Sequence, residues 1–103
     1  MRMYGKAGST YKVASTDTAV AMAAGVLVDS AMGLIDSVSI AVETNNIRVA
    51  IGTPTQAGVG ILLYPGDVIE IEGNSDCNNL SWISAANGVH GALQITPRYD
   101  YGG

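Results

Sequence analysis

The stretch SVSIAVETNNIRVAI, residues 37–51, decides the fold class because apolar and polar residues alternate through both of its halves. Such alternation places every second side chain on the same face of a β-strand. Asn45-Asn46, between the halves, predicts a two-residue type I′ turn, since asparagine tolerates positive φ. We therefore predict a β-hairpin with an apolar face and one charge pair on the other face. Its expected cross-strand pairs are Glu43 with Arg48, Val42 with Val49, and Ile40 with Ile51.

Further segments with strand character follow, separated by turn residues. They are Gly60 to Tyr64, Asp67 to Glu72, Leu80 to Ala85, and Gly91 to Pro97. The first is apolar on both faces, which predicts a central strand, and Pro97 predicts a strand end or edge. In residues 13–36 an apolar helical stripe competes with short strands and turns. Gly25 and Gly33 weaken a helix, so we favour the strands.

The chain has 103 residues, enough for one small domain, and only 14% of them are charged while 48% are hydrophobic. These values exclude a disordered chain. Seven or eight short strands with regular turns predict an all-β protein: a single antiparallel β-sandwich, or jelly-roll-like domain, with extended terminal arms. We expect an N-terminal arm at residues 1–12, a sandwich body at 13–97 and a C-terminal tail at 98–103.

Charge and aromatic residues are distributed unevenly along the chain. Residues 13–97 carry eight acids against Arg48 alone, whereas the two ends carry four bases against Asp100. The ends also hold four of the six aromatic residues of the chain. Tyrosine and arginine are enriched at protein interfaces. The terminal residues that combine these chemistries are Arg2, Tyr4, Lys6, Tyr11, Lys12, Arg98, Tyr99 and Tyr101.

No residue constellation predicts an enzyme, a metal site or a cofactor site. His90 is the only histidine, and a triad with Ser84 and Asp76 would lack the nucleophile-elbow motif. Residues 74–78 begin like a calcium loop, but the required glycine and glutamate are missing, so we expect a polar connection between sheets. Glu70 and Glu72 are expected on a solvated strand face. The single Cys77 excludes an internal disulfide.

Nucleic acid and membrane are not expected partners. The net charge of −4 argues against nucleic acid. The most apolar window, Ala19 to Val28, has roughly half of the ~20 residues needed to cross a bilayer. Arg2, Lys6 and Lys12 precede it, as in a signal peptide, but Asp17 interrupts the approach, so export is the weaker alternative.

Residues 38–99 resemble a family of small structural proteins of tailed bacteriophages. The resemblance rests on Ile47-Arg48-Val49, on the turn Pro65-Gly66-Asp67, and on Ile83-Ser84-Ala85-Ala86-Asn87-Gly88. It implies a virion component assembled in the host cytoplasm. The leading expectation is a capsid cement, or decoration, protein on the capsid surface, with the major capsid protein as partner and a homo-trimer as its assembly. A neck or tail adaptor is the alternative within the same family.

The terminal residues named above have two interpretations. In one, they form docking arms that clamp neighbouring capsid subunits, guided by electrostatic complementarity. In the other, they are edge strands that pack on their own domain. A different functional class, a glycan- or receptor-binding module, would require Trp82 as an exposed platform. The position of Trp82 between Leu80 and Ile83 favours core packing instead.

Overall fold

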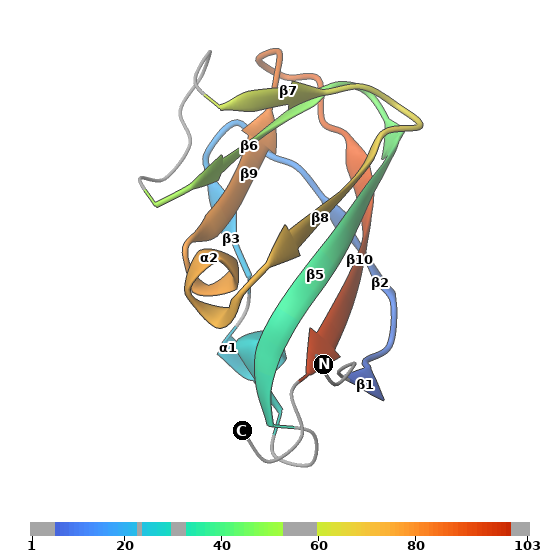
Figure 1. Ribbon diagram of the computed structural model, residues 1–103. Coiled ribbons are helices and arrows are strands. Elements are labelled where there is room, and N and C mark those ends of the chain that lie inside the picture. Colours follow the sequence, from blue (N-terminus) through green and yellow to red (C-terminus); the bar gives the residue numbers. More distant parts are fainter. Residues whose placement is uncertain (1–5, 23, 30–32, 53–59, 100–103) are drawn as a thin grey trace.

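The computed structural model describes residues 6–22, 24–29, 33–52 and 60–99, which form two antiparallel β-sheets packed face to face (Figure 1). This arrangement confirms the predicted all-β sandwich. Residues 13–36 contain mainly short strands, as expected, together with one helical turn. Among the described residues, no helix is long and apolar enough to span a membrane.

The first sheet is built around the long strand β5 and the last strand of the chain, β10. β5 pairs with β10 on one side and with β8 on the other, and β10 pairs in turn with β2. Two-residue strands extend both margins, β1 beside β10 and β4 beside β5. The bounds are β1 Lys6–Ala7, β2 Tyr11–Ala14, β4 Val28–Asp29, β5 Gly33–Thr44, β8 Val68–Glu72 and β10 Ala92–Tyr99.

The second sheet has four strands in the order β3-β9-β6-β7. These are β3 Val20–Ala21, β6 Ile47–Ile51, β7 Ile61–Leu63 and β9 Leu80–Ser84. Two helical turns lie in connections between strands, α1 Ala24–Leu27 before β4 and α2 Asn74–Asn78 between β8 and β9. The polar segment at residues 74–78 therefore does connect one sheet to the other, as expected, but as a helical turn.

The core lies between the two sheets and is formed by the inward residues of their strands. β5 and β10 contribute from the first sheet, and β6 and β9 from the second. Ile69 and Ile71 of β8 point inward and are partly buried, while Glu70 and Glu72 are exposed, as predicted. The fully buried large side chains are Ile35, Val38, Ile40, Ile47, Val49, Leu80, Trp82, Leu93 and Ile95.

The predicted hairpin at residues 37–51 is wrong, although its inward faces are right. β5 and β6 belong to different sheets, so their apolar faces meet across the core instead of lying side by side. β10 and β8 occupy both edges of β5 and leave no edge free for β6. Asn45 adopts the expected positive φ, 56°, but its turn carries the chain from one sheet to the other. The pair of Glu43 with Arg48 does not form, and Ile51 is 39% exposed.

Two smaller expectations are also corrected. β7 is the outer strand of its sheet instead of a central one, and Ile61 on it is 60% exposed. Pro97 lies within β10 instead of at its end. The carbonyl of Pro97 accepts a hydrogen bond from the Gly8 amide, so the missing Pro97 N–H faces the interval between β1 and β2. The missing donor lies on the side of the strand away from β5, so the pairing of β10 with β5 is intact, which is why this strand tolerates proline.

Substitution of Ile40 and Ile51 by alanine distinguishes the sandwich from a hairpin, in which the two residues would be paired. Ile40 is fully buried, so Ile40→Ala should lower the free energy of unfolding by about 2–5 kcal/mol. Ile51→Ala should cost less than about 1 kcal/mol, because Ile51 is substantially exposed. Urea denaturation measures both. Equal losses would contradict the separation of β5 and β6.

Candidate functional site

The terminal residues expected to dock on a partner lie largely within the first sheet. Lys6 is in β1 and pairs in register with Tyr99, so residues 6–12 and 98–99 belong to the sandwich and not to extended arms. The main chains of β1 and β2 pair with β10, and residues 98–99 are the last two residues of β10. Arg2, Tyr4 and Tyr101 lie outside the described residues.

Tyr99 and Tyr11 pack against the core of their own chain. Tyr99 is 4% exposed and its hydroxyl donates a hydrogen bond of 2.6 Å to the carbonyl of Val26. Tyr11 packs against the core cluster, and burial, followed by the neighbouring Tyr99, raises the pKa of Tyr11. The ring and the hydroxyl of Tyr99 are therefore engaged within the chain and do not form part of the exposed surface. Tyr99 thus packs on its own domain, but β10 is paired on both sides and is not an edge strand.

Lys12 and Arg98, in contrast, are exposed on the outer face of the first sheet. The neighbouring Val13 and Pro97 point into the sandwich, so Lys12 and Arg98 point outward. Lys12 approaches Glu43 at 3.8 Å, a surface ion pair of little energetic weight. On the opposite margin of this outer face, β8 carries the acidic Glu70 and Glu72. The outer face therefore carries basic side chains on β2 and β10, with Glu43 of β5 beside Lys12, and acidic side chains on β8.

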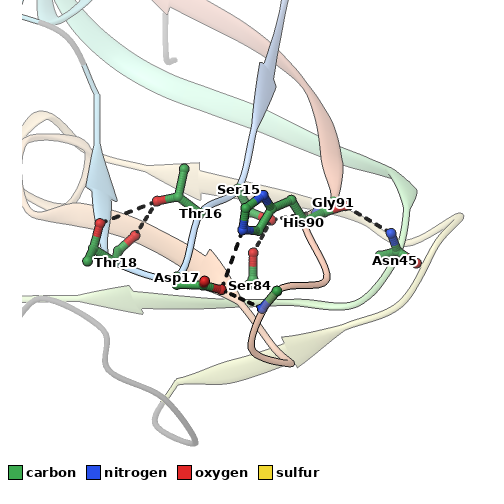
Figure 2. Close-up of polar contacts among 9 residues, drawn as sticks. Ser15, Thr16, Asp17, Thr18, Asn45, Ser84, His90 and Gly91 are labelled. Atoms are coloured by element: carbon green, nitrogen blue, oxygen red, sulfur yellow. Dashed lines mark hydrogen bonds and ion pairs between the residues drawn. The ribbon is translucent and has the colours of Figure 1, made fainter.

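At one end of the sandwich, buried hydroxyl groups join the strand connections (Figure 2). The Ser15 and Ser84 hydroxyls lie 2.8 Å apart and are both buried. The Gly91 amide donates to Ser15 Oγ at 2.7 Å, and the Ser15 amide donates back to the Gly91 carbonyl. A Cβ at Gly91 would lie 2.5 Å from the Thr44 carbonyl oxygen, so only glycine fits. These contacts fix the β2–β3 connection against the β9–β10 loop.

His90 lies beside this cluster, with Asp17 as its acidic neighbour. His90 Nε2 is 3.4 Å from Asp17 Oδ1, which also accepts a hydrogen bond from the Gly88 amide (Figure 2). Ser84 Oγ is engaged by Ser15, and Asp76 lies on α2 at the opposite end of β9. The His90 carbonyl accepts a hydrogen bond from the Asn45 side chain. Asp76 is thus separated from Ser84 and His90, and His90 instead links the β2–β3, β5–β6 and β9–β10 connections.

A groove of about 450 Å³ opens at the same end, on the outer side of the second sheet. It lies between the β5–β6 turn, the β7–β8 turn and the β9–β10 loop, and Arg48 of β6 contributes its cationic group. The Arg48 Nη1 donates to the Gly60 carbonyl at 3.0 Å, while Nε is buried without a hydrogen-bond partner. The side chains that give the groove its chemistry are Asn45, Asn46, Arg48, Leu62, Pro65 and Val89.

Two further residues bear on function through their burial. Trp82 is 1% exposed in the core, so it cannot serve as a glycan platform. Cys77 is fully buried, and burial, with smaller contributions from Asp76 and Asp36, raises the pKa of its thiol to about 11. Its thiol is therefore protonated and unreactive near neutral pH. In the part of the chain that the structure describes, no cluster of histidine, cysteine and acidic residues could hold a metal ion.

Comparison of the chain with protein family models, with curated proteins and with solved structures finds no match. The fold and the local chemistry must therefore carry any functional argument. Sequence reasoning missed the groove and the contact of Asp17 with His90. The sequence held one signal for the groove, because Arg48 is the only arginine or lysine in residues 13–97. Nothing in the sequence indicated that the β5–β6 turn, the β7–β8 turn and the β9–β10 loop meet to form the groove.

Removal of the two buried serine hydroxyls should have unequal effects. Ser15→Ala leaves the Gly91 amide and Ser84 without their partner, so it should cost about 1–3 kcal/mol. Ser84→Ala removes only the hydroxyl pair and should cost less, and Thr18→Ala on the exposed connection serves as the control. Thermal or urea unfolding provides the values. A larger loss for Ser84→Ala than for Ser15→Ala would contradict the hydrogen bond from Gly91.

The raised pKa of Cys77 makes stability depend on alkaline pH. The folded chain holds the thiol proton more tightly than the unfolded chain, in which the thiol pKa has its ordinary value of 9.0. The resulting stabilisation is complete below pH 9 and is lost as the pH rises toward about 11. Urea unfolding between pH 8 and pH 11 should therefore give a steeper decline for the natural chain than for Cys77→Ala. Parallel declines would show that the thiol does not contribute.

Proposed function

We propose that this protein is a non-enzymatic virion component, a capsid cement protein that binds the major capsid protein as a homo-trimer. The observation that carries the proposal is the charge-ordered outer face of the first sheet, whose basic side chains Lys12 and Arg98 are exposed on paired strands. A surface held by strand pairing is rigid, so binding costs little conformational entropy. Such a surface suits an acidic region of a capsid subunit.

The strand order supports the same proposal. Leaving aside the two-residue extensions β1 and β4, the sheets are β2-β10-β5-β8 and β3-β9-β6-β7. In chain order these are strands one, eight, three and six, and strands two, seven, four and five. This is the order of a jelly roll, an architecture that recurs in viral capsid proteins and in lectins. The resemblance of residues 38–99 to bacteriophage structural proteins favours the viral member of that pair.

The core position of Trp82 argues against the lectin alternative, and the buried Ser84 hydroxyl argues against an enzymatic one. The described surface could bind a partner through its area, its shape and the arrangement of its charges. Binding at many symmetry-related sites on a capsid would multiply contacts that are weak individually. A neck or tail adaptor would use the same kind of surface at far fewer sites.

The test uses capsids assembled without the protein, to which the purified chain is added. We expect a trimeric mass in solution, co-sedimentation with the capsids and increased resistance of the capsids to heat. The double substitution Lys12→Glu and Arg98→Glu should weaken binding by about tenfold or more, since each tenfold is only ~1.4 kcal/mol. Binding of the natural chain should also fall with added salt.

The matched control reverses two charges on the acidic margin of the same face, Glu70→Lys and Glu72→Lys. It should retain binding, because both side chains are on β8, which β5 separates from β10, and the substitutions remove no positive charge. A monomer that does not sediment with capsids would overturn the cement assignment. Equal losses in the two double variants would overturn the assignment of the basic margin as the contact.

A further inference from the structure

Among the described residues, Arg48 has no counter-charge, although the body of the chain is acidic. Arg48 is the only arginine or lysine between residues 13 and 97, where eight acids are present. The expected partner, Glu43, instead lies near Lys12 and accepts a hydrogen bond from the Gln94 side chain. Among the residues that the structure describes, no carboxylate forms an ion pair with Arg48.

The guanidinium of Arg48 is partly withdrawn from water. One nitrogen donates to the Gly60 carbonyl, and Nε is buried with no partner. A charge that is removed from water without a compensating partner is costly, and leaving a buried donor unpaired adds to that cost. A carboxylate is the group that best compensates arginine, because two parallel charge-assisted hydrogen bonds match its planar fork.

The groove around Arg48 combines this cation with amides and apolar walls. The Asn45 amide is held in place by its hydrogen bond to the His90 carbonyl, and the side chain of Asn46 has no partner among the described residues. Leu62, Pro65 and Val89 provide apolar surface, and Val89 is 43% exposed. A volume of about 450 Å³ lies within the range of small-ligand sites.

We propose that this groove binds one acidic side chain, aspartate or glutamate, on an otherwise apolar peptide segment of the partner protein. The inference deepens the proposed function, on which the identity of the partner rests. One cation matches one carboxylate, the asparagine amides can hydrogen-bond a peptide backbone, and the apolar walls accept the flanking residues. An acidic polysaccharide fits less well, since its repeated charges would meet the acidic body and no aromatic side chain lines the described groove.

The first experiment measures binding of short peptides by amide chemical-shift changes in the ¹⁵N-labelled full chain. The probes are acetyl-Val-Glu-Val-amide and its isosteric control acetyl-Val-Gln-Val-amide. We expect the glutamate peptide to shift the amides of Asn45, Asn46 and Val89 and to bind about tenfold more tightly than the control. Equal shifts from both peptides, or shifts confined to other residues, would overturn the proposal. So would tighter binding of glucuronic acid than of the peptide.

Substitutions then test Arg48 itself. Arg48→Gln should abolish the preference for glutamate over glutamine, and Arg48→Lys should retain only part of it, because lysine keeps the charge but lacks the fork. Lys12→Gln is the matched control: it removes one positive charge outside the groove and should leave the preference unchanged. If Arg48→Gln does not fold, Asn46→Asp provides the test, since a carboxylate in the groove should repel the probe. Unchanged peptide binding in Asn46→Asp and in a folded Arg48→Gln would overturn the proposal.

Capsid binding separates this inference from the proposed function. Peptide binding without co-sedimentation with capsids would uphold the groove and overturn the cement role. Co-sedimentation that survives Arg48→Gln, together with no peptide binding, would uphold the cement role and overturn the groove. Loss of both activities in Arg48→Gln, with peptide binding retained in Lys12→Gln, would support the two proposals together.

Discussion

β5 is paired along both of its edges, and this constraint determines the arrangement of the strands around it. β10 pairs with β5 from Ile35 to Thr44, and β8 pairs with β5 from Ser37 to Ala41. The chain that leaves β5 therefore finds no free edge to continue the sheet. It turns at Asn45, with φ of 56°, and enters the opposite sheet as β6. The inward faces of β5 and β6 then close the core between them.

The passage of the chain from β5 to β6 also determines where the groove lies. Because β6 begins directly after the turn, Arg48 lies at the end of the second sheet, next to the β9–β10 loop. The Ala85 amide bonds the Asn46 carbonyl, and Asn45 bonds the His90 carbonyl, so turn and loop hold each other. The buried hydroxyl contact of Ser15 and Ser84 secures the same loop from the side of β2. The groove is thus formed by connections whose positions are fixed by hydrogen bonds.

The sequence predicted the direction of side chains much better than the pairing of strands. Alternation follows from the pleat of a single strand, so Val38 and Ile40 could be assigned to the core from sequence alone. The same alternation is expected whether the next strand pairs alongside or faces it across a core, and this ambiguity produced the wrong hairpin. Pro97 is a similar case. Its missing N–H faces Gly8, between β1 and β2, and this position is known only once both strands are paired with β10.

Part of the site was also open to prediction. The sequence shows that Arg48 is an isolated positive charge. It did not predict that Arg48 lacks an acidic partner, because the expected hairpin paired Arg48 with Glu43. The exposure of Lys12 and Arg98 was implied by their chemistry, whereas the burial of Tyr99 depends on its contact with Val26, 73 positions away. Contacts over such separations depend on the pairing of whole strands, which no local pattern encodes.

The two proposed contacts lie on different sheets, and both use positively charged side chains. Lys12 and Arg98 point outward from the first sheet, while Arg48 points outward from the second, since its neighbour Val49 is buried in the core. A single copy therefore presents basic side chains on one side and an acceptor for a carboxylate on the other. A protein that strengthens a shell must contact at least two subunits at once, and contacts on opposite faces of a rigid sandwich meet that requirement. Simultaneous engagement would raise the effective affinity well above that of either contact alone.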